Sequence, residues 1–178
     1  IAVLFASLKM MAEQVQAVSI GDISELKGKA ELIRADNDLQ IQAIQGGSIQ
    51  QNDEPITYNG RMALKFLDDS TVRLTEHSQL LIDEYIYDPD PSKSKMALTF
   101  AMGTTRFITG NLNRIDKQNI QLKTPTANIS IRGTDFSATV NELGESLIIL
   151  LPDAFGLSSG EIEVITGGGS VLLNKPFQ

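Results

Sequence analysis

The stretch from residue 61 to residue 74 reads RMALKFLDDSTVRL, and its pattern recurs through most of the chain. The apolar residues Met62, Leu64 and Phe66 alternate with Arg, Ala and Lys, and a second alternating run follows a turn at Asp68. A period of two places one row of side chains in a core and the other row in water. The stretch therefore predicts two half-buried β-strands joined by a tight turn.

Turn signals separate further runs of this kind about every 8–12 residues, a spacing typical of all-β proteins. The strongest of these signals is Asn59-Gly60, because both residue types tolerate a positive φ. The sequence therefore predicts an all-β fold, a single domain of many short strands arranged as an irregular β-solenoid, a roll or a sandwich. No repeat of fixed length supports a regular β-helix. The further alternating runs lie at residues 79–82, 95–100, 120–123, 129–132 and 136–140.

Two segments depart from strict alternation. Residues 18–26 are compatible with one short helix or turn. Residues 147–151 read LIILL, and a continuously apolar run predicts a strand that is covered on both faces or lies under a neighbouring layer.

The composition excludes several classes of function. The 178 residues include 15 Lys and Arg against 22 Asp and Glu, which gives a net charge of −7. This balance argues against nucleic-acid binding, which depends on dense contacts between basic side chains and phosphate, and against a general attraction to anionic lipid. The chain has no Cys and one His, so disulfides, thiol catalysis and metal sites with two imidazoles are excluded. We expect no cofactor.

The first residues have the pattern of a signal peptide. Residues 1–8 form an apolar run, and residues 15–17 offer a cleavage site after Ala17. We interpret residues 1–17 as the remnant of a signal-peptide helix outside the fold, which predicts a periplasmic or secreted protein. An amphipathic helix of a cytoplasmic protein is the alternative. No other stretch reaches the roughly 20 residues of a membrane span, so we expect no stable membrane anchor in this chain.

The most specific motif reads Thr-Pro-x-Ala, followed by Arg-Gly-Thr-x-Phe. Its members are Thr124, Pro125, Ala127, Arg132, Gly133, Thr134 and Phe136. Together with the run at residues 62–74 and the segment Gly103-x-x-Arg106-Phe107, this motif resembles the signature of the FecR-type domain family. The resemblance extends from about Gly47 to Val164. It implies the fold of that family and an extracytoplasmic setting.

We interpret the signature residues as structural. Pro125 fixes φ and favours an extended residue before it, which suits the start of a strand. Gly133 marks a bend, where the Thr134 hydroxyl is expected to bond to local backbone, and Phe136 returns to the core row. Arg132 is expected to pair with a carboxylate or with backbone carbonyls across a turn.

The chain departs from the family pattern at two places. Asp68-Asp69-Ser70 stands where the family usually has Asp-Gly-Ser, and the turn can survive because Asp also visits the left-handed region. Residues 152–159 are an insertion before the next strand. The regulators that give the family its name also carry a cytoplasmic anti-sigma segment, a membrane span and a receptor-binding domain. The resemblance does not cover those parts, so it does not imply a role in iron-transport signalling.

These observations divide the chain into four parts. Residues 1–17 are the signal-peptide remnant, and residues 18–46 are N-terminal strands that lead into the domain. Residues 47–166 are the FecR-like β-domain. Residues 167–178 begin a C-terminal extension that we expect to be truncated.

Few residues are candidates for chemistry. His77 lies near a turn without a nucleophile motif, so we expect a surface histidine rather than a member of a catalytic triad. An acidic cluster could attract calcium, but the spacing of a calcium-binding loop is missing. We therefore expect a solvated loop and no metal site there. The cluster consists of Asp83, Glu84, Asp88 and Asp90.

The same region is a possible loop for binding a protein partner, because Tyr is enriched in interfaces and Pro lowers the cost of ordering. The residues of this loop are Tyr85, Tyr87, Asp88 and Asp90. The sequence favours a non-enzymatic extracytoplasmic FecR-like β-domain that acts through contacts with an unknown protein partner, as an envelope sensing or signalling module. A secreted structural, adhesive or carbohydrate-binding module is the alternative. A hydrolase with an unmarked pair of carboxylates is the third hypothesis.

Overall fold

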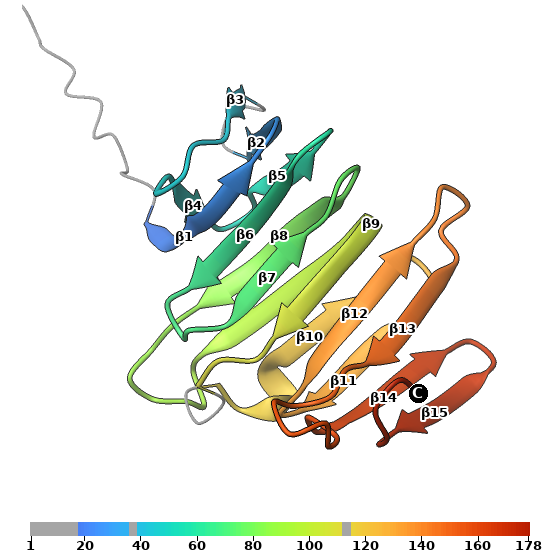
Figure 1. The fold of residues 1–178 in the computed structure, drawn as a ribbon. Coiled ribbons are helices and arrows are strands. Elements are labelled where there is room, and N and C mark those ends of the chain that lie inside the picture. Colours follow the sequence, from blue (N-terminus) through green and yellow to red (C-terminus); the bar gives the residue numbers. More distant parts are fainter. Residues whose placement is uncertain (1–17, 36–38, 112–114) are drawn as a thin grey trace, which may run out of the picture.

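The computed structural model describes residues 18–35, 39–111 and 115–178, and these residues form strands throughout (Figure 1). The signal-peptide helix expected at residues 1–17 lies outside the described residues. The described part contains one 3-10 turn, η2 (Lys117–Asn119), and no helix long and apolar enough to cross a membrane. Its strands are β1 (Ser19–Lys27), β2 (Ala30–Arg34), β3 (Leu39–Gln42), β4 (Ser48–Gln50), β5 (Glu54–Thr57), β6 (Arg61–Phe66), β7 (Thr71–Leu74), β8 (Gln79–Ile86), β9 (Lys95–Ile108), β10 (Ile120–Lys123), β11 (Asn128–Arg132), β12 (Asp135–Val140), β13 (Ser146–Leu150), β14 (Glu161–Thr166) and β15 (Gly169–Leu173).

The strands form two layers, which we call sheet A and sheet B, and β9 belongs to both (Figure 1). Sheet A has the order β4-β1-β6-β7-β9-β12-β13. Sheet B has the order β3-β2-β5-β8-β9-β10-β11-β14-β15. Strands β9 and β10 are parallel, and the other pairs are antiparallel. Because neither sheet closes on itself, each layer ends in strands with one unpaired edge.

Strand β9 changes sheets at Gly103. Residues before it pair with β8 and β10, and residues after it pair with β7 and β12. The φ angle of Gly103 is +80°, and a Cβ at this position would lie 2.4 Å from the carbonyl oxygen of His77. Glycine alone fits so close a backbone approach. The buried row of β9 shifts at the same point, from even-numbered Phe100 to odd-numbered Phe107.

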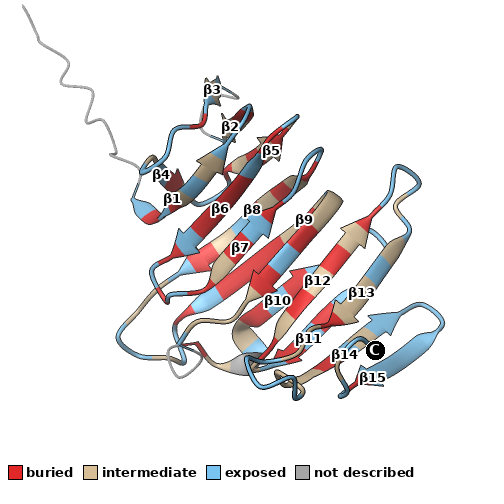
Figure 2. Cartoon of the chain, viewed as in Figure 1, coloured by how far each residue is buried: buried red, intermediate tan, exposed pale blue. Residues whose placement is uncertain are grey.

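The inner rows of the two layers share one core (Figure 2). Phe66 of sheet A stacks on Tyr85 of sheet B with ring centroids 5.1 Å apart, and Phe136 of β12 meets Phe100 edge to face at 5.9 Å. Such aromatic pairs add about 0.5–1.5 kcal/mol beyond the burial of their area. The all-β prediction is confirmed. The sequence left a β-solenoid, a roll and a sandwich open. The two packed layers of the structure correspond to a sandwich.

Three local expectations are wrong. Residues 19–26 belong to β1, and the short helix or turn does not form, because β4 and β6 pair with this segment from both sides. Asn59-Gly60 does not close a hairpin, because β5 pairs within sheet B and β6 within sheet A. The apolar run at residues 147–151 is not covered on both faces. It forms β13 at the edge of sheet A, where Leu147 is 59% exposed.

Candidate interaction surface

The signature residues build the crossover from sheet B to sheet A. Strand β11 ends in sheet B at Arg132, Gly133 has a φ of +61°, and β12 begins in sheet A at Asp135. Phe136 then points into the core, as the sequence pattern predicts, and contacts the rings of Phe100 and Phe107. The bend expected at Gly133 is therefore one of the points where the chain changes layers.

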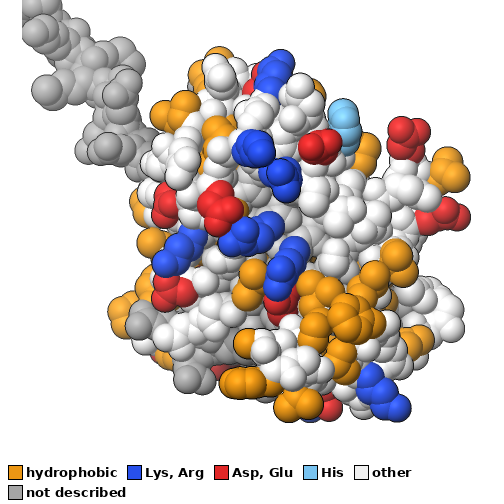
Figure 3. Space-filling view, viewed as in Figure 1, with side chains coloured by type: hydrophobic (Ala, Val, Ile, Leu, Met, Phe, Trp, Pro, Cys, Tyr) orange, Lys and Arg blue, Asp and Glu red, His pale blue; other side chains and the backbone are white. Residues whose placement is uncertain are grey.

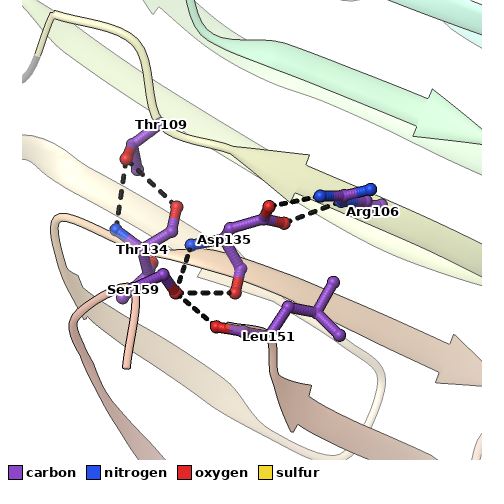
Figure 4. Close-up of polar contacts among 6 residues, drawn as sticks. All are labelled: Arg106, Thr109, Thr134, Asp135, Leu151 and Ser159. Atoms are coloured by element: carbon purple, nitrogen blue, oxygen red, sulfur yellow. Dashed lines mark hydrogen bonds and ion pairs between the residues drawn. The ribbon is translucent and has the colours of Figure 1, made fainter. Parts of the chain in front are cut away.

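Thr109, at the end of β9, holds the crossover in place (Figure 4). Its hydroxyl accepts from the Thr134 N–H at 3.1 Å and donates to the Thr134 carbonyl oxygen at 3.0 Å. The Thr134 hydroxyl is buried and has no hydrogen-bond partner among the described residues. The prediction that this hydroxyl bonds to local backbone is therefore wrong. The backbone of Thr134 is instead bonded by the Thr109 hydroxyl, which comes from the neighbouring strand β9. The spacing of residues along the chain does not predict this contact.

Ser159 ties the crossover to the insertion (Figure 4). Its hydroxyl accepts from the Asp135 N–H at 3.0 Å and donates to the Leu151 carbonyl oxygen at 2.7 Å. The Asp135 side chain accepts two hydrogen bonds from Arg106, from Nε at 2.8 Å and from Nη2 at 2.5 Å. The hydrogen bond that Arg106 donates to the Asp135 carboxylate raises the pKa of Arg106 above its usual value.

Thr124 closes the turn before β11. Its hydroxyl oxygen accepts from the Ala127 N–H at 3.1 Å and from the Ser146 hydroxyl at 2.7 Å. Thr124 and Ala127 are buried, whereas Pro125 is exposed. This half of the signature thus organises a turn, and it also fixes the start of β13 next to it.

Arg132 forms an ion pair with Glu161 of β14, its direct cross-strand neighbour, at 3.5 Å. A carboxylate partner was expected, but it lies across the sheet and not across a turn. The Arg132 side chain is 72% exposed, and exposed pairs of this kind contribute about 0–1 kcal/mol.

The loop singled out for partner binding is only partly exposed. Tyr85 is not in the loop, because it lies in β8, is 3% exposed and donates its hydroxyl to the buried Asp68 at 3.0 Å. Burial raises the pKa of Tyr85 well above its usual value. Tyr87 is partly buried against the core, and Asp88 is half-buried. Asp90 is exposed, but its carboxylate accepts from the Ser92 N–H within the loop at 3.1 Å.

The carboxylates of the acidic cluster around this loop do not meet at one point, because each has a different partner. Asp83 accepts from Thr99, Glu84 pairs with Lys95, and Asp88 accepts from the Asp90 N–H. Among the described residues there is no group of three or more His, Asp or Glu side chains that could hold a metal ion. His77 is an exposed turn residue with a φ of +53°.

A different feature marks the outer face of sheet A. A groove of about 780 Å³ crosses β1, β6, β7, β9 and β12, and we call it the basic groove. Figure 3 shows Lys and Arg side chains gathered over these strands. The groove is lined by four cationic side chains and one acidic side chain in a protein whose net charge is −7. The charged lining residues are Glu25, Lys27, Arg61, Arg73 and Arg106.

Strand register places the four cations in two facing pairs. Lys27 lies directly opposite Arg61, and Arg73 lies directly opposite Arg106. Like charges at facing positions of a sheet are destabilising. Arg73 is compensated by Glu25 at 3.0 Å and Arg106 by Asp135. The Lys27 and Arg61 side chains are exposed and form no hydrogen bond or ion pair with the described residues.

Apolar side chains adjoin the groove at its β12 end. Figure 3 shows hydrophobic side chains over β13 and around the loop after it, beside the basic row. Phe155 is 88% exposed at the tip of a tight turn that Asp153 closes, and Leu157 is 65% exposed. We call this surface the apolar end, and it consists of Leu147, Ile149, Leu151, Phe155 and Leu157.

Sequence reasoning missed both surfaces. The alternating pattern does place Arg61 and Arg73 in the outer rows of their strands, and that signal was available. It could not show that these rows lie side by side with Lys27 and Arg106, because the sequence does not give the strand order.

The fold and its outer face thus define an all-β module with charged and apolar surfaces, in which no metal cluster occurs among the described residues. The chain belongs to the FecR family, because the model of that family, described as FecR protein, matches residues 55–151, more than half of the chain. The family is a regulatory, envelope-associated signalling family. No match was found among curated proteins or among solved structures.

Proposed function

We propose that this chain is a non-enzymatic, extracytoplasmic interaction module, which binds an extended segment of a partner protein at the apolar end as part of envelope signalling. The family supports the signalling class. The observation that carries the binding role is the exposure of Phe155, Leu157 and Leu147 on one end of the molecule. Large apolar side chains gathered on a surface are typical of sites that bind another protein.

The edge of β13 supports an extended partner segment. The N–H and C=O of Leu150 point away from β12 and bond to residues 177 and 178. Because backbone groups in an antiparallel strand alternate sides, those of Ile148 point the same way, and they have no backbone partner among the described residues. A segment added beside β13 would pair with them and lay its side chains against the apolar end.

The test places a photoreactive amino acid at Phe155 in cells that express the gene. The matched control carries the same group at Lys123, an exposed position on β10 of sheet B. We expect one protein to be crosslinked from position 155 and not from position 123. The same protein, once purified, should bind the chain at least about tenfold more weakly after Phe155→Ser, which corresponds to about 1.4 kcal/mol. Identical crosslinks from both positions, or unchanged binding by the variant, would contradict the proposal.

The extracytoplasmic location is tested separately. Cells that express the gene are fractionated, and the N-terminus of the mature protein is sequenced. We expect a product in the periplasm or the medium that begins at Val18. A cytoplasmic product with residues 1–17 intact would contradict the signal-peptide interpretation.

A further inference from the structure

The basic groove contains an excess of positive charge that the described residues do not neutralise. Lys27 and Arg61 face each other on neighbouring strands without an acidic partner among those residues. Next to them, the facing pair Arg73 and Arg106 has one carboxylate for each guanidinium. The protein thus compensates one pair of like charges and leaves the other exposed in the same groove.

We infer that the basic groove binds an acidic peptide segment of the partner protein, with its carboxylates on Lys27 and Arg61. This inference rests on the proposed function and names the chemistry of the partner. A carboxylate placed between the two cations would replace their mutual repulsion with two charge-assisted hydrogen bonds. Arg61 can also hold a carboxylate with two parallel N–H donors, which fixes its orientation.

The surroundings favour a peptide over other polyanions. Thr75, Thr104 and Ser137 line the groove with hydroxyls, and none of the described residues that line it is aromatic. Binding of single-stranded nucleic acid depends on stacking of bases on aromatic rings. Leu151 connects the groove to the apolar end. A peptide can carry both acidic and apolar side chains and so follow this continuous surface.

The probes are two short fluorescein-labelled peptides of the same length, one built from Glu and Leu and the other with Gln in place of Glu. Binding to the purified chain is followed by fluorescence anisotropy at low and at physiological salt. We expect the Glu peptide to bind at least about tenfold more tightly than the Gln peptide. We expect this difference to shrink as salt rises, because exposed charges are screened.

The decisive variant is Lys27→Glu combined with Arg61→Glu, and Lys27→Gln with Arg61→Gln is the milder version. Both positions are exposed, so thermal unfolding should be nearly unchanged, and a melt confirms folding. We expect the charge reversal to weaken binding of the Glu peptide at least about tenfold. Lys123→Glu combined with Lys175→Glu makes the same change of net charge at exposed positions away from the groove lining, and it should leave binding within about twofold.

Several results would overturn the inference. Equal binding of the two peptides would mean that apolar contacts alone act, and the proposed function would survive. Equal weakening by the control pair would mean that net charge and not the groove is responsible. A sulfated oligosaccharide that binds where the Glu peptide does not would assign the groove to a glycan. If Phe155→Ser abolishes partner binding while the Lys27 and Arg61 variants do not, the apolar end binds without the groove.

Discussion

The signature crossover and the apolar end lie next to each other, because the Ser159 hydroxyl forms hydrogen bonds with both Asp135 of the crossover and Leu151 of the apolar end. They are built in opposite ways. At the crossover, Phe136 is buried, the Thr134 N–H and C=O are both hydrogen-bonded, and Arg132 is ion-paired with Glu161. At the apolar end, the side chains of Phe155 and Leu157 are exposed to solvent. The turn that carries them is closed by hydrogen bonds from the backbone N–H groups of both residues to the Asp153 carboxylate.

This difference indicates that the residues that determine the fold are not the residues proposed to bind a partner. The motif that identifies the family builds one of the places where the chain changes layers. The surfaces that could recognise a partner lie in strand rows and in an insertion outside that motif. Conversely, the charged side chain within the signature, Arg132, forms a surface ion pair on sheet B and does not reach the basic groove.

The largest effect is expected at Phe136. Phe136→Ala removes a ring that contacts Phe100 and Phe107 in the shared core, and the cavity should lower the free energy of unfolding by about 3–5 kcal/mol. Urea unfolding followed by circular dichroism measures the loss. A loss below about 1 kcal/mol would show that the crossover does not depend on its aromatic contact.

A smaller effect is expected at Ser159, which joins the two regions. Ser159→Ala leaves the Asp135 N–H without its acceptor, so we expect a loss of about 1–3 kcal/mol in the free energy of unfolding. Ser170→Ala, at an exposed position in β15, is the matched control and should be neutral. Equal effects of the two changes would mean that the insertion is not held to the crossover through this hydroxyl.

The two threonines at the crossover should behave differently. Thr109→Val removes two hydrogen bonds to the Thr134 backbone and should cost about 1–2 kcal/mol. Thr134→Val removes a buried hydroxyl without a partner, so its effect should stay within about 0.5 kcal/mol or be stabilising. Both are measured by urea unfolding under the same conditions. The reverse order would return the Thr134 hydroxyl to the role that the sequence first suggested.

The smallest effect on folding is expected at the apolar end. Phe155→Ser exposes no new surface of the core and should change the free energy of unfolding by less than about 0.5 kcal/mol, while it weakens partner binding. Thermal unfolding of the purified variant checks this result. A clear loss of stability would mean that Phe155 packs on the fold, and the contrast with Phe136 would disappear.

Much of the fold could be predicted because it depends on local alternation. The inward rows of β6, β7, β11 and β12 follow from the period of two in their sequences, and the left-handed Asp69 confirms the turn that the Asp68-Asp69 sequence allowed. The predictions from sequence were wrong where the pairing of strands decides the local structure. Residues 18–26 become a strand through β4 and β6, and residues 147–151 lie at an edge because no further strand of sheet A follows β13.

By itself, the sequence determined the strand-rich class, the family and the bend at Gly133, because alternation, glycine and the signature motif are properties of neighbouring residues. The tertiary structure alone decided which strands lie side by side. It placed Lys27 opposite Arg61 and Arg73 opposite Arg106, paired Asp135 with Arg106, and buried Tyr85 against Asp68. Those contacts join residues far apart in the chain, and their geometry depends on strand order and register, which a period of two does not specify.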